Sequence, residues 1–114
     1  MILYGISNCD TVRKAQKFLQ AHNIEYKFHD IRKDGLTTEL IADWANRVSY
    51  KLLVNTRSTT WRNITEEQRQ AIENKDFSLL IEHCTIIKRP LLDTGESIHL
   101  GFNLETYQKL ANNK

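Results

Sequence analysis

The chain has 114 residues, of which 40% are hydrophobic and 26% charged, and its formal net charge is +2. This composition is typical of a globular domain that can bury a core without disulfide staples, so we expect a single domain over residues 1–114. The small net charge and the lack of an apolar run near the roughly 20 residues of a membrane span exclude direct nucleic-acid and membrane partners from our expectations.

The amino-terminal residues predict a strand, a helix and a second strand. Residues 2–6 form a short apolar run typical of a buried strand. Helical spacing follows at Val12, Ala15, Leu19 and His22. Asn23 is placed for a left-handed helix stop, and residues 24–29 alternate as in a strand with one buried face. Because a helix joins the two strands, we expect them to be parallel.

The middle of the chain, at about residues 35–85, predicts a helical insert. Thr37 is the expected N-cap of one helix, and Thr65 opens a capping box with Gln68 at the start of another. We expect a short helical turn over residues 50–54 and a loop or helix caps over residues 55–63. The last helix of the insert has a stripe of apolar residues: Phe77, Leu80, Ile81 and Cys84. This spacing predicts that Cys84 lies in the core.

The carboxyl-terminal residues predict a hairpin and a final helix. Pro90 opens a short strand, a turn follows at residues 93–96, and residues 97–100 form the second strand. Asn103 is the expected N-cap of the last helix. The order predicts an α/β fold, a four-stranded mixed sheet with helices and a helical insert, which is a thioredoxin-like arrangement.

Cys9 is the strongest candidate for chemistry. It follows the first strand and begins a helix, where the helix dipole and the unpaired N–H groups favour an anion. A thiolate is an anion, so this position lowers the pKa of the thiol and makes it a nucleophile. Asn8 and Thr11 cap this helix or donate hydrogen bonds to the sulfur. The alternative is that Cys9 is a small buried residue without chemistry.

Two arginines are the candidate anion-binding residues. Arg57 and Arg89 carry planar guanidinium groups that hold a carboxylate or oxyanion with two hydrogen bonds. Arg89 directly precedes Pro90, the one proline of the chain, and we expect this proline to shape the cleft. The alternative for both arginines is ordinary surface solvation.

Two cysteines without a paired framework indicate a reducing compartment, and we expect a cytoplasmic protein. Four scattered histidines give no metal-ligand spacing, so no metal site is predicted. Cys9 has no neighbouring resolving cysteine, so a second thiol must release any covalent adduct. Glutathione is the abundant candidate, and we expect it as a co-substrate, with no tightly bound cofactor.

Five stretches of the sequence together resemble the arsenate reductase (ArsC) and Spx family, in particular its YffB-like branch. They are Tyr4–Thr11, Phe28–Leu36, Asn55–Arg62, Ile87–Pro90 and Gly101–Phe102. The resemblance implies a thioredoxin-like fold, Cys9 as nucleophile, Arg57 and Arg89 on the oxyanion, and Pro90 as a cis-proline. It favours a glutathione-dependent thiol reductase that acts as a monomer on a small anionic or thiol substrate, with glutaredoxin as a further partner.

Two alternatives within this resemblance stay open. One is true arsenate reduction, although the family's third arginine has no counterpart in residues 99–102. The other is a non-catalytic regulator of the Spx kind that binds a protein such as the RNA polymerase α subunit. Val12 stands where the CxxC switch of those regulators has its second cysteine.

Overall fold

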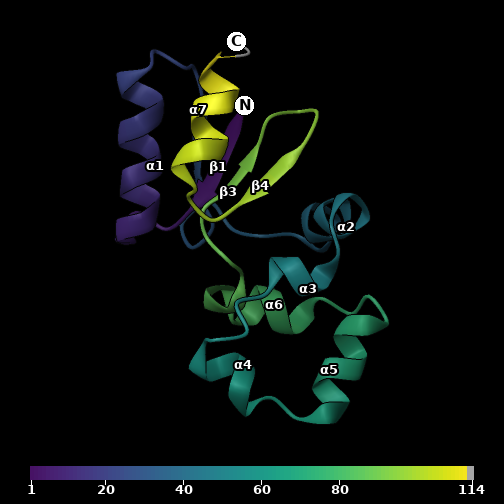
Figure 1. Cartoon of the computed structure of the whole chain (residues 1–114). Coiled ribbons are helices and arrows are strands. Elements are labelled where there is room, and N and C mark those ends of the chain that lie inside the picture. The colour runs from purple at the N-terminus through teal and green to yellow at the C-terminus, as the bar shows by residue number, and fades with distance from the viewer. Residues whose placement is uncertain (113–114) are drawn as a thin grey trace. The chain divides into compact units, whose positions relative to one another are not determined.

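The computed structural model describes residues 1–112. The chain begins with β1 (Ile2–Gly5), α1 (Asp10–Ala21) and β2 (Lys27–Asp30), as Figure 1 shows. Helical segments follow in order: α2 (Thr38–Arg47), α3 (Tyr50–Leu53), α4 (Thr59–Asn63), α5 (Glu66–Glu73), α6 (Ser78–Glu82) and the 3₁₀ turn η1 (Cys84–Ile86). The last elements are β3 (Leu91–Asp93), β4 (Ile98–Leu100) and α7 (Leu104–Asn112).

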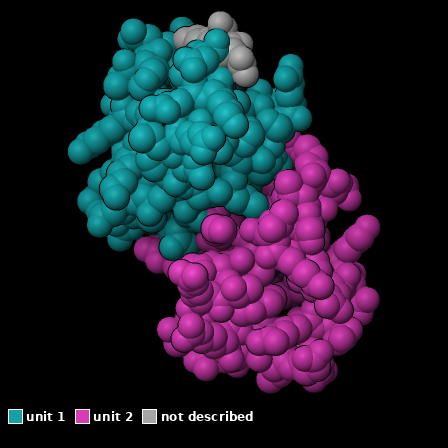
Figure 2. All heavy atoms as spheres, viewed as in Figure 1, with its two compact units in different colours: residues 1–31, 89–114 teal, residues 32–88 magenta. Residues whose placement is uncertain are grey.

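The chain divides into two compact units, which Figure 2 colours separately. One unit combines residues 1–31 with the segment that begins at residue 89, and it holds the whole sheet with α1 and α7. The other unit is the continuous segment 32–88, which holds the remaining helices and an isolated antiparallel bridge between Val54 and Ile87. The organisation of residues 1–114 as one domain with an insert stays a prediction.

The sheet of the first unit has the strand order β2-β1-β3-β4. β1 and β2 run parallel, with Gly5 opposite Asp30. β1 pairs with β3 in the antiparallel sense, with Tyr4 opposite Leu91, and β3 pairs with β4 in a hairpin. The predicted mixed four-stranded sheet and the α/β class are therefore confirmed.

α1 and α7 pack on the sheet through one apolar cluster. Its buried members include four residues of α1 and one residue from each of β1, β3 and α7: Val12, Ala15, Phe18, Leu19, Leu3, Leu92 and Tyr107. Phe18 meets Tyr107 edge to face, with ring centroids 5.7 Å apart. Apolar residues at helical spacing on α1 thus become buried contacts that fix the helix on the sheet.

The end of α1 explains why β2 begins later than residue 24. Asn23 has a φ of 55°, which confirms the predicted left-handed stop. The next N–H group, of Ile24, donates to the carbonyl of Leu19 at 2.9 Å and completes the helix cap. Because Ile24 is still bonded to the helix, the strand ladder starts only at Lys27.

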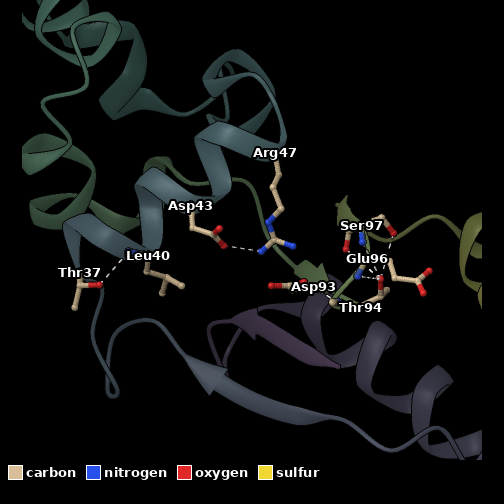
Figure 3. Close-up of polar contacts among 9 residues, drawn as sticks. Thr37, Leu40, Asp43, Arg47, Asp93, Thr94, Glu96 and Ser97 are labelled. Carbon is tan, nitrogen blue, oxygen red and sulfur yellow. Dashed lines mark hydrogen bonds and ion pairs between the residues drawn. The ribbon is translucent and has the colours of Figure 1, made fainter.

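Two helices of the second unit, α2 and α5, begin at their predicted caps. Thr37 accepts a hydrogen bond from the N–H of Leu40 at 3.1 Å, and an ion pair of 2.7 Å joins Arg47 to Asp43 on the same helix, α2 (Figure 3). Thr65 and Gln68 form the complete capping box of α5. In residues 55–63, which were predicted as loop or caps, Ser58 caps the short helix α4 through the N–H of Trp61.

The predicted helix from Phe77 to Cys84 is wrong in its last two residues. α6 ends at Glu82, and His83 has φ −118° and ψ 67°, which lie outside the helical range. Cys84 therefore starts η1 out of register with the apolar stripe and is half-buried instead of lying in the core.

The β3–β4 hairpin turns over residues 94–97. The carboxylate of Asp93 accepts the N–H of Gly95 at 2.9 Å, and the Thr94 hydroxyl accepts the N–H groups of Glu96 and Ser97 (Figure 3). Gly95 has a φ of 95°, a conformation that glycine adopts without a steric penalty. A turn is therefore present as predicted, but it begins one residue later than the predicted residues 93–96, because Asp93 is the last residue of β3.

Candidate active site

Cys9 is the N-cap residue of α1, as the sequence predicts. Its φ and ψ of −98° and 124° are extended, and its carbonyl accepts the first helical hydrogen bond, from the N–H of Arg13 at 3.0 Å. Its own N–H donates to the carbonyl of Ile6 at 3.2 Å and closes a tight turn after β1. The turn thus holds the thiol where the unpaired N–H groups of the helix begin.

The surroundings of the thiol favour its charged form. Partial burial of Cys9 opposes ionisation, but the backbone N–H groups of Val12 and Thr11 and the guanidinium of Arg89 outweigh it, so the pKa of Cys9 lies below its ordinary value. The Cys9 side chain makes no capping hydrogen bond to the first turn of α1. The N–H groups therefore act mainly by stabilising the thiolate.

Antiparallel pairing of β1 and β3 explains how Arg89 meets Cys9. Tyr4 lies opposite Leu91, so the residues before Leu91 run alongside the residues that follow Tyr4. Arg89 thereby comes to the turn that carries Cys9, where its guanidinium lowers the pKa of the thiol. Pro90 is buried, its peptide bond with Arg89 is cis, and its carbonyl accepts the N–H of Gly101 at 2.8 Å.

Asp30 lies next to the turn that carries Cys9, and the sequence analysis gave it no role of its own. Its exposed fraction is 5%, and it is the one buried charged residue among those the structure describes. Its carboxylate accepts the N–H of Ser7 at 3.4 Å, within the same turn. Its position at the end of β2, next to the end of β1, was the signal that could have identified it.

Asn8 and Thr11 flank the thiol in different ways. Asn8 is exposed and precedes the N-cap, so the predicted capping by its side chain is wrong, because Cys9 occupies that position. Thr11 is half-buried and acts on the sulfur through its backbone N–H. Their part in binding an anion stays a prediction.

Arg57 belongs to the second unit, whereas Cys9 and Arg89 belong to the first. It is exposed, and its backbone N–H donates to the side chain of Asn55 at 3.1 Å, just before the cap of α4. Its predicted role in holding the anion stays a prediction.

Neither cysteine forms a disulfide. In residues 1–112, no three or more histidine, cysteine or acidic side chains are grouped so that they could hold a metal ion. No helix of this part of the chain is long and apolar enough to cross a membrane.

A family model described as the ArsC family matches residues 4–110. The chain belongs to the ArsC family. It is 44% identical to an uncharacterized protein of Haemophilus influenzae over 107 residues, which cover 93% of this chain and 94% of that protein.

Solved structures of ArsC-related proteins share the fold. A protein named YffB is 33% identical with a TM-score of 0.84, and the match covers 95% of this chain and 96% of that one. An arsenate reductase (ArsC) related protein of Brucella melitensis is 32% identical with a TM-score of 0.73, covering 95% and 91% of the two chains. The global transcriptional regulator Spx 2 of Bacillus cereus is 26% identical over 111 residues, which cover 96% of this chain and 85% of the regulator.

Proposed function

We propose that this ArsC-family protein is a glutathione-dependent thiol reductase with Cys9 as its nucleophile. The observation that supports this most directly is the thiol at the start of α1, with two backbone N–H groups and the Arg89 guanidinium stabilising its thiolate. A thiolate at neutral pH is the reactive form in thiol–disulfide exchange.

The reaction proceeds by two exchanges. The Cys9 thiolate attacks the glutathione sulfur of a mixed disulfide between glutathione and a substrate thiol. A disulfide forms between Cys9 and glutathione, and the substrate leaves as a thiolate that takes a proton from water. A second glutathione, as its thiolate, attacks the glutathione sulfur of the adduct, which releases oxidised glutathione and returns Cys9 as a thiolate. One disulfide is reduced and one is formed, so the electrons balance.

Arg89 supplies the cation in this mechanism. It lies at the sulfur, so it stabilises both the attacking thiolate of Cys9 and the same thiolate when it leaves. Arg57 is proposed as a second anion-binding arginine on the resemblance of its motif alone. Pro90 is proposed to shape the cleft beside the nucleophile.

The test is the reduction of a glutathionylated peptide in the presence of glutathione, followed by release of oxidised glutathione. The wild-type protein and Cys84→Ser turn over, whereas Cys9→Ser does not. Mass spectrometry detects one glutathione on Cys9 when the second glutathione is withheld. Equal turnover by wild type and Cys9→Ser would refute the proposal.

A second candidate is a protein-binding regulator, supported by the similarity to the Spx 2 regulator. This candidate needs no reactive thiol. A pull-down with purified RNA polymerase α subunit tests it, with Cys9→Ser as the matched variant. Binding by both proteins supports the regulator, and no binding by either one refutes it.

A further inference from the structure

The helical unit contains a cavity of its own, within residues 32–88. It has a volume of about 330 Å³ and is lined by side chains of α3, α4 and α5. The lining residues that bear charge or an aromatic ring are Tyr50, Lys51, Trp61, Glu66, Arg69 and Glu73. This volume is at the lower end of the range for small-molecule sites, so it suits a ligand of the size of an amino acid.

Arg69 is the distinctive residue of this cavity. It is half-buried, and its guanidinium carbon lies 5.3 Å from the centroid of the Trp61 ring. Its Nε is fully buried and has no hydrogen-bond partner among the residues that the structure describes. Stacking on an aromatic face fixes the plane of a guanidinium and leaves the donors at its edge available.

The two glutamates of the cavity have other partners. Glu73 accepts a hydrogen bond of 2.6 Å from the Tyr50 hydroxyl, and this bond raises the pKa of Tyr50, so the phenol stays a donor. Glu66 accepts a bond of 3.3 Å from the side chain of Gln70 and is otherwise exposed. Both glutamates lie one turn from Arg69 on α5, yet within residues 1–112 neither forms an ion pair with it.

The signs of these charges restrict the ligand. A ligand with only a carboxylate would meet Arg69 but would be repelled by Glu66 and Glu73. A ligand with only an ammonium group would be repelled by Arg69 and Lys51. A ligand that carries both groups can place its ammonium group at a glutamate of α5 and its carboxylate at Arg69, which forms no ion pair among the residues that the structure describes.

We propose that this cavity binds an α-amino-acid head group, with the ligand's carboxylate on Arg69 and its ammonium group on Glu66. The head group can come from a free amino acid or from the γ-glutamyl end of a peptide such as glutathione, since both carry a free ammonium and a free carboxylate on one carbon. The proposal goes beyond the reaction at Cys9 and does not depend on it.

The experiment follows the signals of the tryptophan indole N–H groups in N–H correlation spectra. It uses the Cys9→Ser protein, because this variant cannot form a covalent adduct with the probes. Trp61 reports on the cavity, and the fully buried Trp44 is the internal control. The probes are L-glutamine, its N-acetyl and α-amide derivatives, and S-methylglutathione. We expect a saturable shift of the Trp61 signal with L-glutamine or S-methylglutathione and none of the Trp44 signal. Saturation by L-glutamine identifies an amino-acid site, and saturation by S-methylglutathione alone identifies a peptide site.

Two comparisons decide the proposal. Arg69→Gln should weaken binding about tenfold or more, because it removes the guanidinium N–H donors that hold the carboxylate. The matched control is Arg62→Gln, at an exposed arginine of α4, which should leave binding unchanged. The N-acetyl and amide derivatives also bind about tenfold more weakly, because each lacks one charge. The proposal is overturned if no probe gives a saturable shift or if Arg69→Gln binds the saturating probe as wild type does. Where L-glutamine saturates, it is also overturned if the N-acetyl derivative binds equally well.

Discussion

Replacement of Gly5 by alanine should loosen the contact between β1 and α1. A Cβ at this position would lie 2.7 and 2.9 Å from the two γ carbons of Val12. Carbon atoms in contact are ordinarily separated by about 3.5–4.0 Å. Val12 is fully buried and, as a β-branched residue in a helix, is restricted to one rotamer. The γ carbons therefore cannot turn away, and α1 has to move.

The size of the effect follows from two opposing contributions. Overpacking of a well-packed core by a methyl group costs about 1–3 kcal/mol. Replacing glycine by alanine also restricts the unfolded chain, which stabilises the protein by about 0.4–1 kcal/mol. We expect Gly5→Ala to lower the free energy of unfolding by about 1–2 kcal/mol, because the steric contribution is the larger.

A double-mutant cycle with Val12→Ala separates the clash from other causes. Val12→Ala alone is destabilising through its cavity, but in the Gly5→Ala background it also relieves the contact. Urea unfolding of the four proteins should give a favourable coupling energy of about 1–2 kcal/mol. Additive effects of the two substitutions, or a Gly5→Ala protein as stable as wild type, would refute the steric account of this glycine.

Three further changes test other parts of the structure. Tyr107→Phe should raise the free energy of unfolding by up to about 1 kcal/mol, because the Tyr107 hydroxyl is buried without a partner among the described residues. Urea titrations measure this, and a loss of stability would contradict it. Thr65→Ala should lower the free energy of unfolding by about 1 kcal/mol, because the capping box with Gln68 is lost. A thermal melt that matches that of wild type would count against this. Arg89→Gln should raise the pKa of Cys9, because the thiolate loses its neighbouring cation. Alkylation of Cys9 at neutral pH should therefore become slower. An unchanged pH profile of alkylation would show that the guanidinium does not act on the sulfur.

Local patterns predicted much of the fold because the interactions behind them are local. The caps at Thr37 and Thr65 involve residues three positions apart, and the left-handed stop at Asn23 depends on that residue's own conformation. The failure at Cys84 has a local cause of another kind. The backbone dihedral angles of His83 are not helical, so the residues after it no longer continue the helical spacing of α6. The spacing of apolar residues alone does not reveal such a break.

The candidate site was predictable in part for the same reason. Cys9 was recognisable because a cysteine between a strand and a helix is a local feature. Its meeting with Arg89 depends on the pairing of β1 with β3, which brings together residues far apart in the chain. The stacking of Arg69 on Trp61 likewise joins two helices, and no spacing in the sequence predicts it.

The pH dependence of Cys9 alkylation tests the account most directly. Iodoacetamide modification is followed peptide by peptide, so that Cys84 serves as the control in the same sample. The account predicts an apparent pKa for Cys9 below the free-thiol value of about 8.5, because the start of α1 and Arg89 stabilise its thiolate. A Cys9 that titrates at or above this value, or that reacts no faster than Cys84 at neutral pH, would contradict the claim that this thiol is prepared for nucleophilic chemistry.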